Sequence, residues 1–283
     1  MIGTVGDLVE DVVVRFAGPV HLASDTDAVV VRRPGGSAAN FAVSVARAGH
    51  RARFIGHVGD DRAGASLLDS LRVEGVDVVA RRGGQTGTII VLVDQSGERS
   101  MLTDRGSCTW LDDPESRWLD GLQALHVPAY SLVGEPLGQT TATLIRCAHQ
   151  RRITVSIDAS SASLINDFGG DALMTMIAER RPSVLFCNEL EAEALGAGVH
   201  PDAIGSEFTV IKRGGRPATL LQLDAAPVEV PALPLGAVRD TTGAGDAFAA
   251  GFIISRAGGA SPVAAVTAAH QSAAKAIAAA SSQ

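Results

Sequence analysis

The strongest constraint on the fold is an alternation of short β-branched segments with helix-forming segments in the second half of the chain. The expected strands cover residues 124–127, 154–157, 184–186 and 208–212, and the expected helices cover 140–150, 170–179 and 189–195. Two strands joined through a helix run parallel, because the helix carries the chain back across one face of the sheet. The alternation therefore predicts an α/β fold, with a mainly parallel sheet between two layers of helices.

The first half of the chain departs from this alternation. Residues 12–33 hold two β-branched runs joined by a turn with glycine and proline, and residues 86–104 hold two more. A hairpin signature at residues 94–97 divides the second pair. We therefore expect a single domain over residues 1–283, with a small β layer contributed by these two regions.

Composition and charge exclude several classes of protein. The formal net charge is −7, which argues against binding nucleic acid through a basic surface. The cysteines Cys108, Cys147 and Cys187 form no CxxC pair, so we expect reduced thiols in a cytoplasmic protein. The alanine-rich segment 263–280 is too short and too polar to span a bilayer, so no membrane partner is expected either.

One motif indicates chemistry directly, where small residues at 240–245 run into a helix. Gly243 and Gly245 have no Cβ, so their backbone N–H groups can approach a ligand closely, and the helix N-terminus favours an anion such as phosphate. Asp246, in the first helical turn, could accept a proton from an alcohol that receives a phosphoryl group. An ordinary helix cap would use the same residues, with Asp246 complementing only the helix dipole. A P-loop is excluded, because the chain contains no GxxxxGK[ST].

A second glycine motif precedes the helix expected at residues 38–48. Gly35 and Gly36 lead into this helix, and Asn40 follows one turn later. The amide of Asn40 can both donate to and accept from sugar hydroxyl groups. A tight turn between a strand and a helix is the alternative interpretation of the same residues.

Together, the two motifs resemble those of the ribokinase-like carbohydrate kinases, the pfkB family. Residues 35–59 match the family's N-terminal signature, and residues 240–253 match its C-terminal signature. Shorter landmarks lie between them in the right order, among them Thr86-Gly87 and an NxxE motif at 188–191. The resemblance covers essentially the whole chain. It implies the ribokinase-like three-layer α/β fold, in which the small β layer is a lid over the site.

The resemblance also implies a role for each matching residue. Asp246 would be the catalytic base, and the amides of Gly243, Ala244 and Gly245 would form the anion hole. The residues implied for the acceptor are Asp11, Gly35, Gly36, Asn40 and Arg105. The residues implied for the nucleotide are Asn188, Lys212, Gly214, Gly243, Gly245 and His270.

The implied cofactors are ATP and Mg²⁺, with K⁺ as a further candidate. Asn188 and Glu191 of the NxxE motif would hold Mg²⁺ mainly through water, which suits an ion that prefers oxygen ligands and keeps several waters. Asp240 would be a ligand of the monovalent cation. We also expect a homodimer through the lid, because exposed strand edges attract partners.

The predicted function is an ATP-dependent phosphotransferase that moves the γ-phosphate to a hydroxymethyl group of a small sugar or sugar derivative. Val9 stands where ribokinases carry an asparagine that contacts ribose, so a nucleoside kinase of the pseudouridine or adenosine type remains an alternative. Only 4% of residues are aromatic, which disfavours stacking on a base. A catalytically silent relative is a third possibility. A dinucleotide-binding oxidoreductase is disfavoured, because no GxGxxG follows the first strand.

Overall fold

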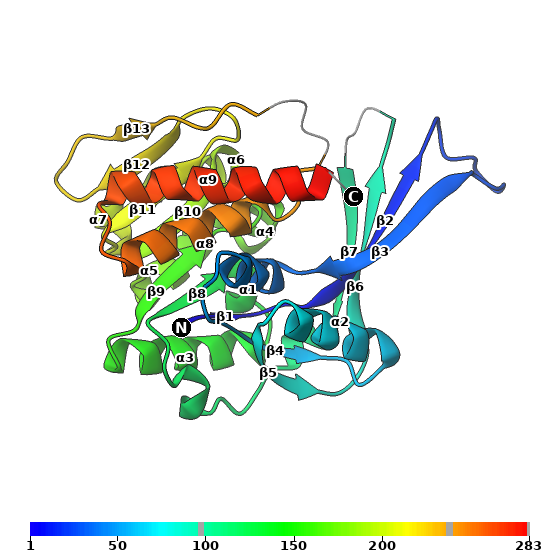
Figure 1. Ribbon diagram of the computed structural model, residues 1–283, viewed down its shortest axis with the longest axis horizontal. Coiled ribbons are helices and arrows are strands. Elements are labelled where there is room, and N and C mark those ends of the chain that lie inside the picture. Colours follow the sequence, from blue (N-terminus) through cyan, green and yellow to red (C-terminus); the bar gives the residue numbers. More distant parts are fainter. Residues whose placement is uncertain (96–98, 236–239, 282–283) are drawn as a thin grey trace.

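The computed structural model describes residues 1–95, 99–235 and 240–281, and within these residues a large sheet forms the centre of the molecule (Figure 1). From one edge to the other, its strands are β13 (Val228–Val230), β12 (Ala218–Gln222), β11 (Phe208–Lys212), β10 (Val184–Asn188), β9 (Thr154–Asp158), β8 (Ala124–Pro128), β1 (Ile2–Val5), β4 (Ala52–Val58) and β5 (Asp77–Arg82). Neighbouring strands from β5 to β11 pair in parallel, and β12 and β13 pair antiparallel. The predicted, mainly parallel sheet is confirmed.

Helices cover both faces of this sheet. One layer consists of α1 (Ser37–Arg47), α2 (Arg62–Val73), α8 (Ala244–Ala257) and α9 (Pro262–Ser281). The other consists of α3 (Leu137–Gln150), α4 (Ala162–Phe168), α5 (Gly170–Arg180), α6 (Glu189–Leu195) and α7 (Pro201–Ile204). Four short 3-10 segments cover Ser107–Trp110, Ser116–Leu119, Ala129–Leu132 and Gly196–Val199. None of the described helices is long and apolar enough to cross a membrane.

The side chains of the strands alternate between two apolar cores. In β4, Phe54 packs into the core on the α1 side, and the next residue, Ile55, packs into the core on the α3 side. Successive residues of a strand point to opposite faces, so a strand covered on both sides is apolar along its whole length. This is why the buried strands were recognisable in the sequence as short, continuous apolar runs.

A separate small sheet stands out from the main body (Figure 1). Its strands, in spatial order, are β3 (Ala28–Gly35), β2 (Val9–Phe16), β6 (Thr86–Val93) and β7 (Arg99–Gly106). The predicted small β layer is confirmed, although its strands extend beyond the predicted runs and the central pair, β2 and β6, is parallel. Part of the hairpin signature at residues 94–97 lies outside the described residues. We call this sheet the lid.

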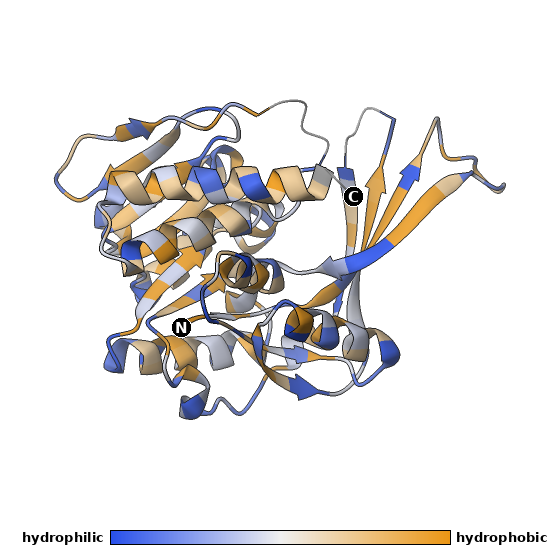
Figure 2. Cartoon of the chain, viewed as in Figure 1, coloured by the Kyte–Doolittle hydropathy of each residue, from blue (hydrophilic) through white to orange (hydrophobic). Residues whose placement is uncertain are grey.

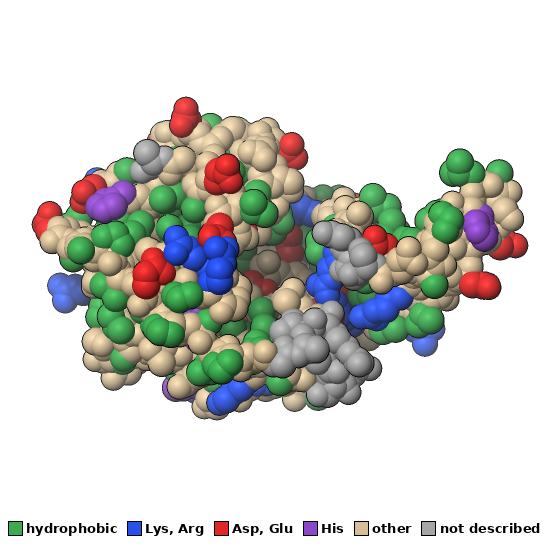
Figure 3. Space-filling view, turned by 90° about the horizontal axis from the view of Figure 1, so that it is seen from above, with side chains coloured by type: hydrophobic (Ala, Val, Ile, Leu, Met, Phe, Trp, Pro, Cys, Tyr) green, Lys and Arg blue, Asp and Glu red, His purple; other side chains and the backbone are tan. Residues whose placement is uncertain are grey.

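The strand order positions the candidate site. The parallel strands β9, β10 and β11 are neighbours, and their last residues are Asp158, Asn188 and Lys212. Because parallel strands end at the same edge, these three polar side chains come together there. Seen from above, the surface is hollowed between the main body and the lid, and acidic side chains lie in the hollow (Figure 3).

Candidate active site

The N-terminus of α8 lies at the centre of the site. Gly243 is the N-cap residue and has a φ of 72°, in the left-handed region that glycine adopts without strain. A Cβ added to Gly245 would lie 3.3 Å from Nζ of Lys212, so this lysine approaches the glycine backbone closely. The N–H of Ala244 donates to the carbonyl of Thr241 at 3.1 Å. Ala244 lines the cavity beside Asp246, and its role as an anion-hole donor stays a prediction.

Asp246 has the properties of a base that works near neutral pH. Burial, reinforced by the neighbouring carboxylate of Asp158, raises its pKa to about 7, while Lys212 and a hydrogen bond from Asn40 oppose the rise. A proton acceptor is most effective when its pKa lies near the working pH. Asp246 can therefore hold or release a proton with little change in free energy.

Lys212 and Asp158 form a close ion pair beside Asp246. Lys212 Nζ lies 2.6 Å from Oδ2 of Asp158. Burial alone would lower the pKa of Lys212, but Asp158, Glu191 and Asp246 outweigh burial and raise it, so the ammonium stays charged. Asp158 was not singled out from the sequence. Its position directly after the buried strand expected at 154–157 is the signal that could have identified it.

The predicted NxxE residues form the start of α6. The Asn188 side chain accepts from the Glu191 N–H at 2.9 Å, and the Asn188 N–H donates to Oε2 of Glu191 at 2.7 Å. This reciprocal pair is a capping box. Burial, followed by the charge of Asp158, raises the pKa of Glu191.

This group of residues fits a magnesium ion that is bound through water. Asp158, Glu191 and Asp246 share one cation, Lys212, so a buried excess of negative charge faces the cavity. Oxygen donors and uncompensated negative charge are what Mg²⁺ requires. Among the described residues, no group of three or more histidine, cysteine or acidic side chains could hold a metal ion directly.

A cavity of about 830 Å³ extends from Asp246 towards α9. It is lined by the predicted residues Asn188, Glu191, Lys212, Gly214, Gly245, Asp246 and His270, together with others. His270 is buried, its Nε2 lies 3.3 Å from the Val230 carbonyl, and its ring packs edge-on against Phe248. Burial lowers the pKa of His270, so a neutral ring forms part of the cavity wall.

The predicted acceptor residues meet on the lid side of Asp246. A Cβ on Gly35 would lie 2.2 Å from Oδ1 of Asp11, which is buried. Gly36 has a φ of 100°, and its Cβ would lie 2.3 Å from the carbonyl oxygen of Asp7. Both glycines are therefore required for these close approaches. We call Asp11, Gly35, Gly36 and Asn40 the acceptor floor. Asn40 connects this floor with the turn at Gly243, because a Cβ added to Gly243 would lie 3.7 Å from the Asn40 amide.

Arg105 occupies the far side of the acceptor region. Its guanidinium donates two hydrogen bonds to Asp7, at 2.9 and 2.8 Å, and lies 6.0 Å from the ring of Tyr130. Burial would lower the pKa of Arg105, but Asp7 outweighs it, so the charge is retained. Asp7 therefore lies beside the predicted acceptor residues, although it was not among the predicted site residues.

Asp240, predicted as a ligand of a monovalent cation, is held by two arginines of the lid. Its Oδ2 accepts from Arg33 at 2.9 Å, and its Oδ1 accepts from Arg99 at 2.7 Å and from the N–H of Thr242 at 2.8 Å. Burial would raise the pKa of Asp240, but the bonds from Arg99, Thr242 and Arg33 hold it far below its usual range. Two guanidinium groups already supply positive charge at this carboxylate, and the role of Asp240 as a cation ligand stays a prediction.

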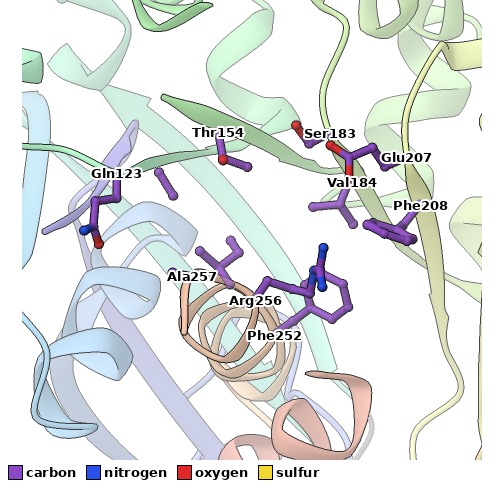
Figure 4. A pocket seen from close by; sticks show the side chains of 11 residues that line it. Gln123, Thr154, Ser183, Val184, Glu207, Phe208, Phe252, Arg256 and Ala257 are labelled. Carbon is purple, nitrogen blue, oxygen red and sulfur yellow. The ribbon is translucent and has the colours of Figure 1, made fainter. Parts of the chain in front are cut away.

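A second cavity lies at the opposite edge of the sheet (Figure 4). It has a volume of about 350 Å³ and is lined by Thr154, Val184 and Phe208 at the first residues of their strands, with Arg256 5.2 Å from the Phe208 ring. None of the predicted site residues lines it. It is separated from Asp158 and Lys212 by the length of the strands.

Comparisons with known proteins agree with this geometry. The model of the pfkB family of carbohydrate kinases matches residues 5–283. An ATP-dependent ribose-1-phosphate kinase from Halopiger xanaduensis is 33% identical over 228 residues, which cover 77% of this chain and 72% of the relative. A fructokinase from Klebsiella pneumoniae is 32% identical over 250 residues, which cover 83% and 80%. The crystal structure of adenosine kinase from Sinorhizobium meliloti has a TM-score of 0.86 at 24% identity, covering 98% and 93%, and shows a shared fold alone.

Proposed function

Since the chain belongs to the pfkB family of carbohydrate kinases, we propose that it transfers the γ-phosphate of ATP to a hydroxymethyl group of a small sugar or sugar derivative. The main observation that supports this proposal is the position of Asp246. It lies between the cavity towards α9 and the acceptor floor, and Asn40 contacts it from the acceptor side. A base at that point can reach a hydroxyl that faces the terminal phosphate of a nucleotide. The predicted ribokinase-like fold is confirmed.

In this reaction Asp246 accepts the proton of the acceptor hydroxyl. The N–H groups of Gly243 and Gly245 donate to the oxygens of the phosphoryl group, where negative charge must be stabilised. Lys212, held by Asp158, adds a positive charge next to the same position. Asn188 and Glu191 would hold Mg²⁺ through water, and the ion would supply positive charge to the phosphate oxygens there.

The remaining predicted residues divide between the two substrates. Asp11, Asn40 and the backbone of Gly35 and Gly36 bind acceptor hydroxyls, and Arg105 closes the far end of the acceptor region. Gly214 and His270 line the cavity on the nucleotide side. These assignments rest on burial and on the distances between the residues.

A screen for ADP release tests the proposal and separates its alternatives. Pentoses, hexoses, sugar acids, sugar phosphates and nucleosides are each supplied with MgATP, and ADP is measured by a coupled assay. The curated relatives described above are sugar kinases, so we expect turnover with a sugar or sugar derivative. Turnover with nucleosides alone would favour the nucleoside kinase, and no turnover with any acceptor would favour the silent relative.

Gly35→Ala is expected to weaken acceptor binding selectively. The new methyl group would lie 2.2 Å from an Asp11 oxygen, so the carboxylate must move. We expect the KM for the acceptor to rise by at least about tenfold, and the KM for ATP to change by less than about twofold. Gly258→Ala is the control, because an added Cβ there meets backbone oxygens no closer than 3.4 Å, at the far end of α8. Equal changes in both KM values would contradict the assignment of Gly35 and Asp11 to the acceptor.

The face of the lid turned away from Asp11 carries the Arg32–Glu10 pair and, beside it, a run of apolar side chains. Strand registers place Val12 opposite Ile90 and Val14 opposite Val30, and Ile90 opposite Leu102. The side chains of Val30 and Leu102 are 55% and 57% exposed, and Figure 2 shows apolar residues along these strands. An exposed apolar face of this kind is typical of a protein interface. We therefore retain the proposal of a homodimer through the lid.

Light scattering at micromolar concentration is expected to give twice the mass of one chain. Leu102→Glu places a charge in the apolar face and should shift the protein towards the monomer. Leu223→Glu is the control, because Leu223 is 51% exposed at the end of β12, far from the lid. A monomeric wild-type protein would contradict the proposed dimer.

A cytoplasmic location remains part of the proposal. Cys108 and Cys187 are free and buried, and burial raises the pKa of the Cys108 thiol to about 12. Protected thiols and the use of ATP suit a reducing compartment.

A further inference from the structure

Two arginines from opposite edges of the lid meet on one turn of the main body. Arg33 comes from β3 and Arg99 from β7. Both donate to Asp240 and to the hydroxyl of Thr242, which directly precede the N-cap glycine of α8. The site assigned above does not use either arginine.

The contacts form a compact arrangement of four hydrogen bonds. Each guanidinium bonds one carboxylate oxygen of Asp240, at 2.9 Å for Arg33 and 2.7 Å for Arg99. Their second nitrogens lie 3.0 and 2.8 Å from the Oγ1 of Thr242. Asp240 is only 4% exposed, so these bonds replace the water that its carboxylate would otherwise need. The planar fork of arginine suits such two-point contacts, and lysine cannot make them.

The same lid strands also carry acceptor residues. Arg33 Nε lies 4.0 Å from Oδ2 of Asp11, and Gly35, two residues after Arg33, packs against that carboxylate. The turn at Asp240 and Thr242 continues into Gly243 and Gly245, whose amides face the phosphoryl group in the proposed reaction. Acceptor floor, lid and anion hole are thus connected through a few charged contacts.

We propose that Arg33 and Arg99 are positioning residues that clamp the closed lid onto the anion-hole turn, and that their guanidinium groups take the place of a monovalent cation at Asp240. The proposal rests on the phosphotransferase function proposed above. When the lid closes, the clamp fixes the turn and thereby the amides of Gly243 and Gly245. When the lid opens, Asp240 loses both partners and the turn loses its fixed conformation.

The charges at the turn argue against a monovalent ion there. Such an ion needs oxygen ligands with free lone pairs, whereas both oxygens of Asp240 already accept from N–H donors. The guanidinium charges of Arg33 and Arg99 at this carboxylate would also repel a further cation. Activity should therefore not depend on K⁺.

Arg33→Gln and Arg99→Gln test the clamp, with Arg32→Gln as the matched control. Arg32 is the neighbour of Arg33 on β3, but its side chain is 64% exposed and pairs with Glu10 on the other face of the lid. We expect each clamp variant to lower kcat by at least about tenfold, with the KM for ATP changed by less than about twofold. Arg99→Lys should restore only a small part of kcat, because lysine cannot bond Asp240 and Thr242 together.

Amide hydrogen exchange at residues 240–246 gives a readout that does not require turnover. With a non-hydrolysable ATP analogue bound, exchange should be faster in both clamp variants than in the wild type and in Arg32→Gln. Replacing K⁺ by tetramethylammonium should change the wild-type kcat by less than about twofold.

The outcomes separate this proposal from the proposed function. Faster exchange in the clamp variants supports the clamp, whether or not an acceptor is phosphorylated. Absence of phosphorylation with every acceptor would contradict the phosphotransferase function but not the clamp. An active wild-type enzyme whose clamp variants match Arg32→Gln in kcat and exchange would overturn the clamp. If K⁺ raises the kcat of the wild type several-fold, the proposal that Arg33 and Arg99 take the place of a monovalent cation at Asp240 is overturned.

Discussion

Asp246→Asn is expected to lower kcat by about 10²–10⁴-fold, because the variant keeps the shape of the side chain but cannot accept the proton of the acceptor hydroxyl. Binding of ATP, measured by calorimetry, should be nearly unchanged, since the amides of Gly243 and Gly245 and the charge of Lys212 remain. Asp69→Asn is the control, because Asp69 is an exposed residue of α2 that pairs with Arg72. Near wild-type turnover of Asp246→Asn would remove Asp246 from the mechanism.

The raised pKa of Asp246 adds a pH dependence to this prediction. Only the carboxylate form can accept a proton, so kcat/KM of the wild type should rise as the pH increases through about 7. The pKa of Asp246 in the folded protein lies above the usual aspartate value of 3.8, so the folded protein binds the proton more tightly than the unfolded chain. Stability from this group is therefore present at low pH and lost as the pH rises through about 7.

The same linkage predicts the stability of the variant. Asparagine carries no charge to bury, so at about pH 8.5 Asp246→Asn should unfold at the same temperature as the wild type or at a higher one. Thermal unfolding by calorimetry measures this difference. A clearly lower unfolding temperature of Asp246→Asn at that pH would show that the ionised carboxylate of Asp246 stabilises the folded protein, contrary to the prediction.

Lys212→Met is expected to have the second largest effect. The change leaves the carboxylates of Asp158, Glu191 and Asp246 in one buried cluster without their cation. We expect kcat to fall by about 10²–10³-fold, as for the loss of a group that stabilises charge in the transition state. The rise of kcat/KM with pH should also move to higher pH, because Lys212 lowers the pKa of Asp246.

Two further variants separate catalysis from folding. Lys212→Met with Asp158→Asn removes both members of the ion pair and should recover stability but not kcat, since a lone buried charge costs several kcal/mol. Lys275→Met is the control, because Lys275 is the other lysine of the chain and lies exposed on α9. A Lys212→Met enzyme that keeps its kcat and its pH profile would contradict the role of this ammonium.

Much of the main sheet was predictable from the sequence. Buried strands such as β9 and β10 are short, continuous apolar runs, and segments of helix-forming residues separate the strands. The edge strand β5 was missed, because Val78 and Val79 stand between Asp77 and two arginines and only one side of the strand is covered. The parallel pairing of β2 with β6 was also missed, since it joins segments that are distant in sequence.

In the candidate site, too, features set by the local sequence were predicted and features set by distant contacts were not. Gly243, Gly245 and Asp246 form a local motif whose chemistry follows from a glycine turn before a helix. Asp7, Arg33 and Arg99 were not predicted, since their roles arise only when the lid is folded against the main body.

Asp240 is the clearest example of a residue whose contacts could not be predicted from its sequence motif. Its position in the motif suggested a cation ligand, but partners 207 and 141 residues away, on β3 and β7, determine what its carboxylate binds.

The most direct test of the proposed reaction is a product analysis by phosphorus NMR of the wild type and Asp246→Asn, with MgATP and the acceptor selected in the screen. For the wild type, we expect the γ-phosphate signal of ATP to be replaced in equal amounts by ADP and by one phosphomonoester coupled to a CH₂ group. Asp246→Asn should give almost none of this product over the same time. ADP formed with inorganic phosphate alone, or equal product from both proteins, would contradict a phosphotransferase in which Asp246 is the base.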